Sequence, residues 1–348
     1  MTKQLKQAIT PTHVLGSTGT SDAADLGYRS LANFKADIGL SPLVTSEDAT
    51  INSLRVGIGA GSLATNAVLG RLAMSSNTTG GSNAAVGDDA LRLNTTGGGN
   101  VAVGADSMES NTIGIFNVAV GGASLDANIS GDGNTAVGLA SLGSAQTADN
   151  NTALGFQSLT ASTSGENGTA IGSGALLSNT SGSNNVAVGK DALKNTTTGS
   201  GNIGIGFTTS AGTYAPSFNP TTENNRLVAG HTSITNAYVK VSWTIVSDAR
   251  DKTEIGGVPH GLDFVNQLNP VSYQFKAGSR DSVGDGINRY GFLAQDILQL
   301  EGDAPVIIDN EDAENLRYRG ESMVPILVNA IKELSAEIEK LKGGLNGN

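Results

Sequence analysis

Apolar and polar positions recur with a fixed 17-residue period through the middle of the chain. Glycine recurs at 17-residue intervals from residue 70 to residue 206, and an aliphatic residue precedes each of these nine glycines. Leucine or methionine follows four residues after each of the first eight of these glycines. The shared core, N-V-A-V-G and its relatives, has the period-two alternation of a half-buried strand. A strict period of this length predicts a repeat architecture of stacked coils.

Seventeen residues are too few for a helix pair, but they suit two short strands and two tight turns. Asparagine stands four residues before the glycine in eight units; in the unit ending at Gly172, Asn167 is one place early. We expect glycine and asparagine at positions of positive φ and equivalent strands about 4.8 Å apart. The sequence predicts a mainly β fold, a parallel β-roll or solenoid over 51–206, with 51–65 as a degenerate first coil.

The recurring asparagines allow two interpretations. Equivalent asparagines in stacked coils can form hydrogen-bonded ladders along the axis. Alternatively, the NTT, NIS and NGT triplets are glycosylation acceptors, which would require a secretory route. We favour the ladder. Each coil also holds few apolar side chains, so several chains side by side would exclude water better than one.

The two ends of the chain lack the repeat. Residues 1–50 suit a cap, which solenoid ends need, or an attachment region. Residues 207–246 begin as a connector rich in Thr, Ser, Pro and Asn, and continue from Arg226 as a strand-like stretch. Residues 247–348 have the composition of a small globular domain and end in a charged, helical tail.

The tail carries three heptads within a helix predicted over 322–342. Position a holds Val324, Ile331 and Ile338, and position d holds Leu327, Leu334 and Leu341. Glu337 can pair with Lys342 on a neighbouring helix, while Gly343 and Gly344 should end the helix. The simpler alternative is an amphipathic helix packed on its own domain. Isoleucine at a with leucine at d favours parallel dimers, so the heptads alone do not indicate a trimer.

Composition excludes several classes of protein. The chain has 348 residues, 47 glycines, no cysteine and a net charge of −11. Phosphate contact needs clustered Lys and Arg, so we expect no nucleic-acid partner. No apolar run approaches the roughly 18 residues that span a bilayer, so we expect no membrane insertion. Residues 66–206 contain neither His nor Cys, and we expect no metal and no cofactor.

The repeat resembles the left-handed parallel β-roll in the heads of trimeric autotransporter adhesins, and similar repeats of phage fibres. The N-[VT]-A-[VLI]-G core carries this resemblance over residues 66–206. The resemblance implies a homotrimer.

The segment from 247 onward resembles the self-cleaving intramolecular chaperone domain of phage endosialidases, tail spikes and fibres. The matching motifs are SDARDK at 247–252, GLDFVNQLNPVSYQF at 261–275, YGFLAQD at 290–296 and VPILVNAIKEL at 324–334. The resemblance implies a trimerising α+β domain that guides fibre folding and then cuts itself off between Val246 and Ser247. It also implies that Ser247 is the nucleophile and Lys252 the base.

The chemistry of that pair is reasonable. A serine hydroxyl needs a neighbouring base to become a good nucleophile, and serine–lysine pairs are a known variant. Asp248, Arg250 and Asp251 are close enough in sequence to orient or tune the lysine. Two residues five positions apart do not lie on the same face of a helix. The pair must therefore meet through an irregular turn or across a subunit boundary. Taken alone, SDARDK also suits an ordinary turn or cap, and His260 is the alternative base.

These features predict a viral structural protein, a homotrimeric tail fibre or appendage used in host attachment. Residues 1–50 would contact a virion tail or capsid component, and a host cell-surface receptor is a further partner. The expected location is the virion, after assembly in the host cytoplasm, and the only enzymatic activity would be a single self-cleavage. The alternatives are a bacterial-type surface adhesin, a fibre that keeps its chaperone domain uncleaved, and a polysaccharide-degrading enzyme. The last is disfavoured because the acids of the repeat do not recur at one position.

Overall fold

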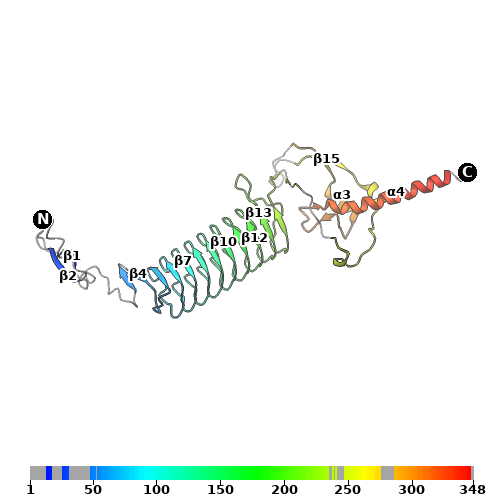
Figure 1. Ribbon diagram of the computed structural model, residues 1–348. Coiled ribbons are helices and arrows are strands. Elements are labelled where there is room, and N and C mark those ends of the chain that lie inside the picture. The colour runs from blue at the N-terminus through cyan, green and yellow to red at the C-terminus, as the bar shows by residue number, and fades with distance from the viewer. Residues whose placement is uncertain are drawn as a thin grey trace. The chain divides into compact units, whose positions relative to one another are not determined.

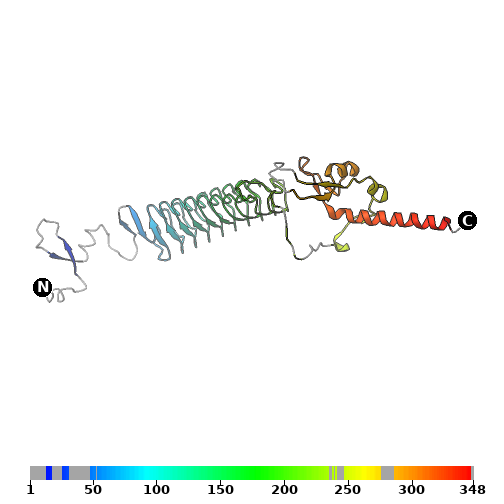
Figure 2. The ribbon, with the colours of Figure 1, turned by 90° about the horizontal axis from the view of Figure 1, so that it is seen from above.

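The protein is described here by a computed structural model that covers residues 13–17, 26–30, 48–51, 53–234, 237, 238, 240, 247–275 and 286–345. The chain divides into two compact units, residues 1–234 and 235–348, and each is described by itself. Figures 1 and 2 show the first unit from two directions, with the coils of a solenoid stacked one behind another.

The solenoid contributes one short strand per coil to a single sheet. Its parallel strands are β5 (Ala67–Gly70), β6 (Ala84–Val86), β7 (Val101–Val103), β8 (Val118–Val120), β9 (Thr135–Val137), β10 (Thr152–Leu154), β11 (Thr169–Ile171), β12 (Val186–Val188), β13 (Ile203–Ile205) and β14 (Leu227–Ala229). From β5 to β13 each residue pairs with its equivalent 17 positions later, as Ala102 does with Ala119. The predicted 17-residue β-solenoid is confirmed.

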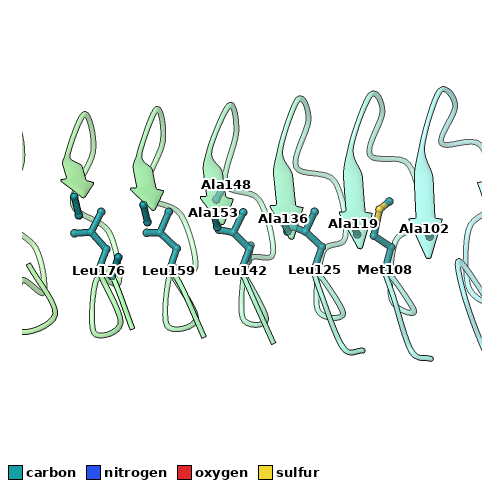
Figure 3. Close-up of a cluster of buried hydrophobic side chains, with 14 of the residues drawn as sticks. Ala102, Met108, Ala119, Leu125, Ala136, Leu142, Ala148, Ala153, Leu159 and Leu176 are labelled. Carbon is teal, nitrogen blue, oxygen red and sulfur yellow. The ribbon is translucent and has the colours of Figure 1, made fainter. Parts of the chain in front are cut away.

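The core consists of two columns that run the length of the solenoid. One is the residue two positions before the repeat glycine, which is alanine except at Val68 and Gly204, and the other is the leucine or methionine four positions after the glycine. Alanines at other positions, such as Ala90 and Ala148, are buried beside these columns. Ala119 and Leu125 represent the two columns, and both are fully buried. Figure 3 shows the leucines of successive coils stacked in one orientation beside the strand alanines. Alanine opposite leucine fills a flattened coil without a gap, which is why no aromatic side chain is needed there.

The conformation of the turns differs from the expectation in one respect. Positive φ is found at the repeat glycines from Gly87 to Gly206, but also at every core leucine and methionine, such as Leu125 with φ of 51°. The buried asparagines do not have it. A leucine with positive φ is strained, and this conformation interrupts the extended backbone. The second strand expected in each coil is consequently absent from the described coils; single hydrogen bonds such as Leu125 N to Ser141 O (3.0 Å) join the coils there instead.

Two asparagine ladders run through the solenoid, as the sequence predicts. In the first, Asn94 Nδ2 donates to Asn77 Oδ1 at 2.9 Å and Asn111 Nδ2 to Asn94 Oδ1 at 2.7 Å. In the second, the backbone N of Asn117 donates to Asn100 Oδ1 at 2.9 Å, and the pattern repeats along the coils. These side chains are buried, so they cannot accept glycans, which rules out that interpretation for them.

Three unpaired buried atoms mark the breaks in the first ladder. The ladder position holds Asn128, then Ala145, Ser162, Asn179 and Thr196. Asn128 Oδ1, Ser162 Oγ and Asn179 Oδ1 have no partner in the described structure. The two asparagine oxygens lack a partner because the next coil has Ala145 or Thr196 at the ladder position. Ser162 Oγ is unpaired although Asn179 follows it, and the Nδ2 of Asn179 donates to the carbonyl oxygen of Gly182 instead.

Both ends of the solenoid are closed. At the first end, β3 (Ala49–Ile51) and β4 (Leu54–Gly57) form a hairpin, and β4 runs antiparallel to β5. Residues 58–66 are too few for a parallel return, so the degenerate first coil expected at 51–65 is wrong. The hairpin covers the edge of the sheet, which would otherwise expose unpaired backbone groups. Further toward the N-terminus, β1 (His13–Ser17) pairs antiparallel with β2 (Leu26–Ser30).

At the second end, residues 207–226 form a longer final coil rather than leaving the solenoid. Strand β14 pairs with β13 in parallel, but Ile203 pairs with Leu227, 24 positions later instead of 17. Phe207 is fully buried against the core, and its ring lies 6.2 Å from that of Tyr214. The insertion therefore supplies the aromatic lid that closes the core. The rest of the strand-like stretch falls largely outside the described residues.

The second unit is a small α+β region, as the sequence predicts. Its elements are η1 (Ala249–Asp251), α2 (Leu262–Gln267), β15 (Val271–Tyr273), β16 (Arg289–Gly291), α3 (Ala294–Glu301), β17 (Ile308–Asp309), β18 (Arg317–Tyr318), η2 (Gly320–Ser322) and α4 (Met323–Leu345). The core contains Phe264, Ile297, Ile307, Ile308, Met323 and Ile326. Helix α4 continues to Leu345 through the glycine pair expected to end it, because glycine also adopts helical backbone angles.

Candidate functional site

The candidate site is a single tight turn that brings Ser247 and Lys252 together within one chain. Asp248 caps the 3-10 turn η1, its side chain accepting a hydrogen bond from the backbone N of Arg250 at 2.9 Å. Lys252 then leaves the turn in an extended conformation. Its Nζ donates to Ser247 Oγ at 2.7 Å and to the Ser247 carbonyl oxygen at 3.2 Å. Of the two routes that the five-residue spacing allowed, this is the irregular turn.

Asp248 and Arg250 form a second pair beside the first. Arg250 Nε lies 3.1 Å from each carboxylate oxygen of Asp248, and Nη2 lies 2.5 Å from Oδ2. This guanidinium, together with the backbone N–H of the turn, holds the pKa of Asp248 below its usual value. The carboxylate raises the pKa of Arg250 in turn. Asp248 therefore stabilises the turn rather than contacting Lys252.

The other supporting residues are not joined to the pair. Among the described residues, the Asp251 carboxylate makes no hydrogen bond with Ser247 or Lys252. The imidazole of His260, the alternative base, stacks on Phe264 with ring centroids 4.3 Å apart, and no hydrogen bond links it to Ser247. Val246, on the other side of the expected cut, lies outside the described residues. The geometry thus favours Lys252 over His260 as the partner of the serine hydroxyl.

Ser247 and Lys252 are both exposed in the single chain. A lysine takes a proton from a hydroxyl only when burial or a nearby positive charge favours its neutral form. Lys252 is not buried in the single chain. The single chain therefore holds the reactive groups at hydrogen-bonding distance without the dry environment that would activate them.

Helix α4 clamps the segment that follows the turn. Glu333 Oε2 accepts from the backbone N of Leu262 at 2.6 Å, which caps the start of α2. Asn329 Nδ2 donates to the carbonyl oxygen of His260 at 3.0 Å. A Cβ at Gly261 would lie 2.2 Å from Glu333 Oε1, so a side chain there would displace the end of the Glu333 side chain from this contact. Sequence reasoning missed Asn329 and Glu333; their i,i+4 spacing on one face of the predicted helix is the signal that could have found them.

The opposite side of α4 is an exposed apolar stripe. All six heptad residues at a and d are exposed, including Ile331 at 63% and Leu341 at 69%, whereas Met323, Ile326 and Ala330 pack inward. The helix therefore packs on its own domain and still presents its heptads to solvent. Lys342 pairs with Glu339 within the helix, at 3.1 Å, and the Glu337–Lys342 pairing between helices stays a prediction.

The described residues contain no group of three or more His, Cys, Asp or Glu side chains arranged to hold a metal ion. No helix among them has the length and apolar character needed to cross a membrane.

Residues 247–304 match the family Peptidase S74, described as the chaperone of endosialidase. The matched region begins at Ser247 and includes the turn, α2 and α3. No curated protein and no solved structure matches the chain. The second unit therefore contains a region similar to the chaperone of endosialidase, preceded in the chain by a β-solenoid. This family implies self-association as a trimer.

Proposed function

We propose that the chain is a homotrimeric viral tail fibre or appendage that takes part in host attachment. Residues 66–206 would form its shaft, and residues 1–50 would join it to a virion component. Two features support this proposal: a β-solenoid suits a rigid spacer, and residues 247–304, which follow it, match the chaperone of endosialidase. The mature protein would be part of the virion, after assembly in the host cytoplasm.

The chaperone domain, in this proposal, aligns three chains while their solenoids fold. The exposed a and d positions of α4 provide the contact, because six apolar side chains in water are stabilised by burial against equivalent helices. The clamp from Asn329 and Glu333 holds residues 258–262, the segment that follows the reactive turn in the chain. Assembly would bury the turn, and cleavage would wait for it.

The self-cleavage we propose is an acyl shift followed by hydrolysis. Neutral Lys252 takes the proton of Ser247 Oγ, and Oγ attacks the carbonyl carbon of Val246. The bond from that carbon to the nitrogen of Ser247 breaks, and the nitrogen takes up the proton, leaving an ester. Water then hydrolyses the ester, releasing a carboxylate at Val246 and restoring the hydroxyl. The contact that carries this proposal is Lys252 Nζ to Ser247 Oγ at 2.7 Å.

The test is the fate of the 35.2 kDa chain on a denaturing gel after assembly. We expect wild type to give two fragments, and Ser247→Ala and Lys252→Arg to stay full length, because one lacks the nucleophile and the other cannot give up its proton. Ser335→Ala, whose hydroxyl bonds only to Ile331 O within α4, is the matched control and should be cut normally. Cleavage of the Ser247→Ala variant would contradict the assignment of Ser247 as the nucleophile. An uncut wild type would favour a fibre that retains its domain.

A further inference from the structure

One aromatic side chain of the solenoid stands at a turn position where the other coils have small or turn-forming residues. The residue twelve positions after the repeat glycine is Ser, Gly or Asn in every other coil from Ser82 to Gly201, and it is Phe116 in one coil. The backbone there is left-handed, with φ of 58° at Phe116 and 56° at Asn150. A bulky residue with such a φ is an outlier, and backbone outliers of this kind cluster at functional sites.

The ring of Phe116 lies against the backbone of the preceding coil. A Cβ at Gly99 would lie 2.7 Å from Cδ1 and 2.9 Å from Cε1 of Phe116, so a side chain at residue 99 would displace the ring. The ring is nevertheless 69% exposed, and it does not belong to the buried core. A strained aromatic residue that adds nothing to the core indicates a contact with something outside the chain.

Polar groups with free hydrogen-bonding capacity lie along the same face. The residues at the same turn position of three later coils are exposed asparagines: Asn150, Asn167 and Asn184. Their carboxamides make no hydrogen bond among the described residues, unlike the buried asparagines of the ladders. One position earlier in the coil, Asp132 Oδ1 accepts from the backbone N of Ile115 at 2.8 Å, which places this carboxylate beside the residue that precedes Phe116. The other oxygen of Asp132 has no partner in the described part of the chain.

The chemistry of this face excludes some ligands. Positions eight to twelve after the repeat glycines carry three charged residues between 66 and 206, all of them acids: Asp132, Asp149 and Glu166. Anionic ligands need Lys or Arg and are therefore disfavoured. The apolar part is small, because it consists of Phe116 with Ile113 and Ile129, which are 54% and 43% exposed. A stable protein interface uses about 20–30 residues on each side, so this patch does not suit a partner protein.

We propose that Phe116, Asp132 and Asn150, with Ile113 and Ile129 beside them, form a binding site for a neutral glycan. The apolar C–H face of a sugar ring stacks on the exposed ring of Phe116. Sugar hydroxyls donate to the free oxygen of the Asp132 carboxylate, and they both donate to and accept from the Asn150 carboxamide. No part of this site is charged positively, so an uncharged glycan meets no unpaired base.

The spacing of these groups suits a short oligosaccharide rather than a single sugar. The Phe116 ring lies over Gly99, and the Asn150 carboxamide lies over Gly133, where a Cβ would be 2.7 Å from Asn150 Oδ1. Gly99 and Gly133 are two coils apart, or about 10 Å. The inference rests on the proposed fibre function, since the glycan would be its host receptor, and three copies of a weak site in a trimer would raise the apparent affinity.

Binding of the full-length protein to an array of neoglycoproteins tests the site. The probes are neutral oligosaccharides, sialylated and sulfated oligosaccharides, and the carrier protein without sugar. We expect wild type to bind one or more neutral probes, and Phe116→Asn to lose about tenfold in signal. The same variant should keep or raise the thermal midpoint, because asparagine fits a left-handed backbone. Phe156→Ala is the matched control, since it removes another exposed aromatic side chain of the solenoid at a different turn position, and it should bind like wild type.

Several results would overturn this site. Wild type could bind no neutral probe, bind charged probes alone, or bind the bare carrier equally well, and the last result would indicate a protein contact. Undiminished binding by Phe116→Asn, or a lower thermal midpoint that shows the ring to stabilise the coil, would also overturn it. Light scattering and a denaturing gel of the same samples separate the two proposals. A cleaved trimer without glycan binding overturns the site alone, whereas an uncut monomer that binds through Phe116 overturns the trimeric fibre alone.

Discussion

The solenoid and the second unit bury their side chains in opposite ways. In the solenoid, the polar groups of each coil pair with those of the next coil, so most buried asparagines from Asn66 to Asn202 lie in ladders and the core repeats with few substitutions. The second unit has a small core around Ile297 and Ile307, while its reactive turn and the heptads of α4 face water. The difference shows that local repetition stabilises the shaft along its axis, whereas the second unit presents its interaction surfaces outward.

The largest expected effect comes from a substitution that unfolds the solenoid and leaves the second unit folded. Gly104 has φ of +137°, and a Cβ there would lie 2.5 Å from the carbonyl oxygen of Gly121. Gly104→Val adds backbone strain of roughly 1–3 kcal/mol to a clash with rigid backbone. We expect the shaft to lose its cooperative thermal transition while the helical circular dichroism of the second unit persists. Gly257→Val, where no atom lies within 4 Å, is the control; a folded shaft in Gly104→Val would refute the stacking described.

The second prediction is that a charge in helix α4 of the second unit prevents trimer formation. Ile331→Asp places a charge at a position of α4 that is 63% exposed in the single chain. Burying a carboxylate against apolar neighbours costs several kcal/mol, so we expect loss of the trimer at micromolar concentration, measured by light scattering. The control is Lys332→Ala, off the heptad stripe. If Ile331→Asp assembles like wild type, α4 does not carry the contact.

Cavity formation should distinguish inner from outer leucines of the solenoid. Leu125→Ala removes a fully buried side chain and should destabilise the shaft by about 2–5 kcal/mol, seen as a lower denaturant midpoint. Leu139→Ala, in which the leucine is 54% exposed, should change the midpoint little in the isolated chain. Equal shifts for the two variants would contradict the two-column core.

Repairing a ladder break should stabilise the shaft. Ala145→Asn supplies a donor for Asn128 Oδ1, which is unpaired in the described structure. One added buried hydrogen bond contributes about 1 kcal/mol, so the thermal midpoint should rise by a few degrees. Ala105→Asn, at an exposed position, should not change it. A lower midpoint for Ala145→Asn would mean that the coil cannot accept the larger side chain.

The smallest effect is electrostatic. Burial raises the pKa of Asp126, and the neighbouring acids Glu109 and Asp106 add to the shift. A folded pKa above the unfolded one costs no stability at low pH, where both states are protonated, and the cost appears as pH rises past about 4. Asp126→Asn should therefore be slightly more stable than wild type at pH 7 and equal to it near pH 3. Asp303→Asn, on an exposed carboxylate, is the control, and a gap that widens at low pH would reverse the sign of this account.

The repeat allowed most of the solenoid to be predicted, because the 17-residue period specifies register, inner and outer faces and the ladders. It did not predict the left-handed backbone at Leu125 and its equivalents. Hydrophobic pattern reports which side chains are inside but not how the backbone brings them there. The structure of the two ends of the solenoid was not predicted either. The hairpin at 49–57 and the lid at Phe207 lie where the 17-residue period is broken, and a periodic pattern says nothing about such segments.

At the candidate site, the sequence predicted the residues but not their geometry. The pair Ser247 and Lys252 was identified from a family resemblance. The structure adds that one 3-10 turn brings the two side chains together. The hydrogen bond from Leu262 to Glu333 spans 71 positions in sequence. The spacing of Asn329 and Glu333 indicates a shared helix face, but it does not indicate which segment that face contacts. Asp248 was expected to orient or tune Lys252. In the structure its carboxylate pairs with Arg250, two residues away, and stabilises the turn instead.

The most direct test of the central claim is the intact mass of the assembled protein. We predict that wild type contains a chain that ends at Val246 and a second that begins at Ser247, while Ser247→Ala has one species at 35.2 kDa. A single uncut species in wild type, or a cut at another bond in both proteins, would contradict self-cleavage by this turn.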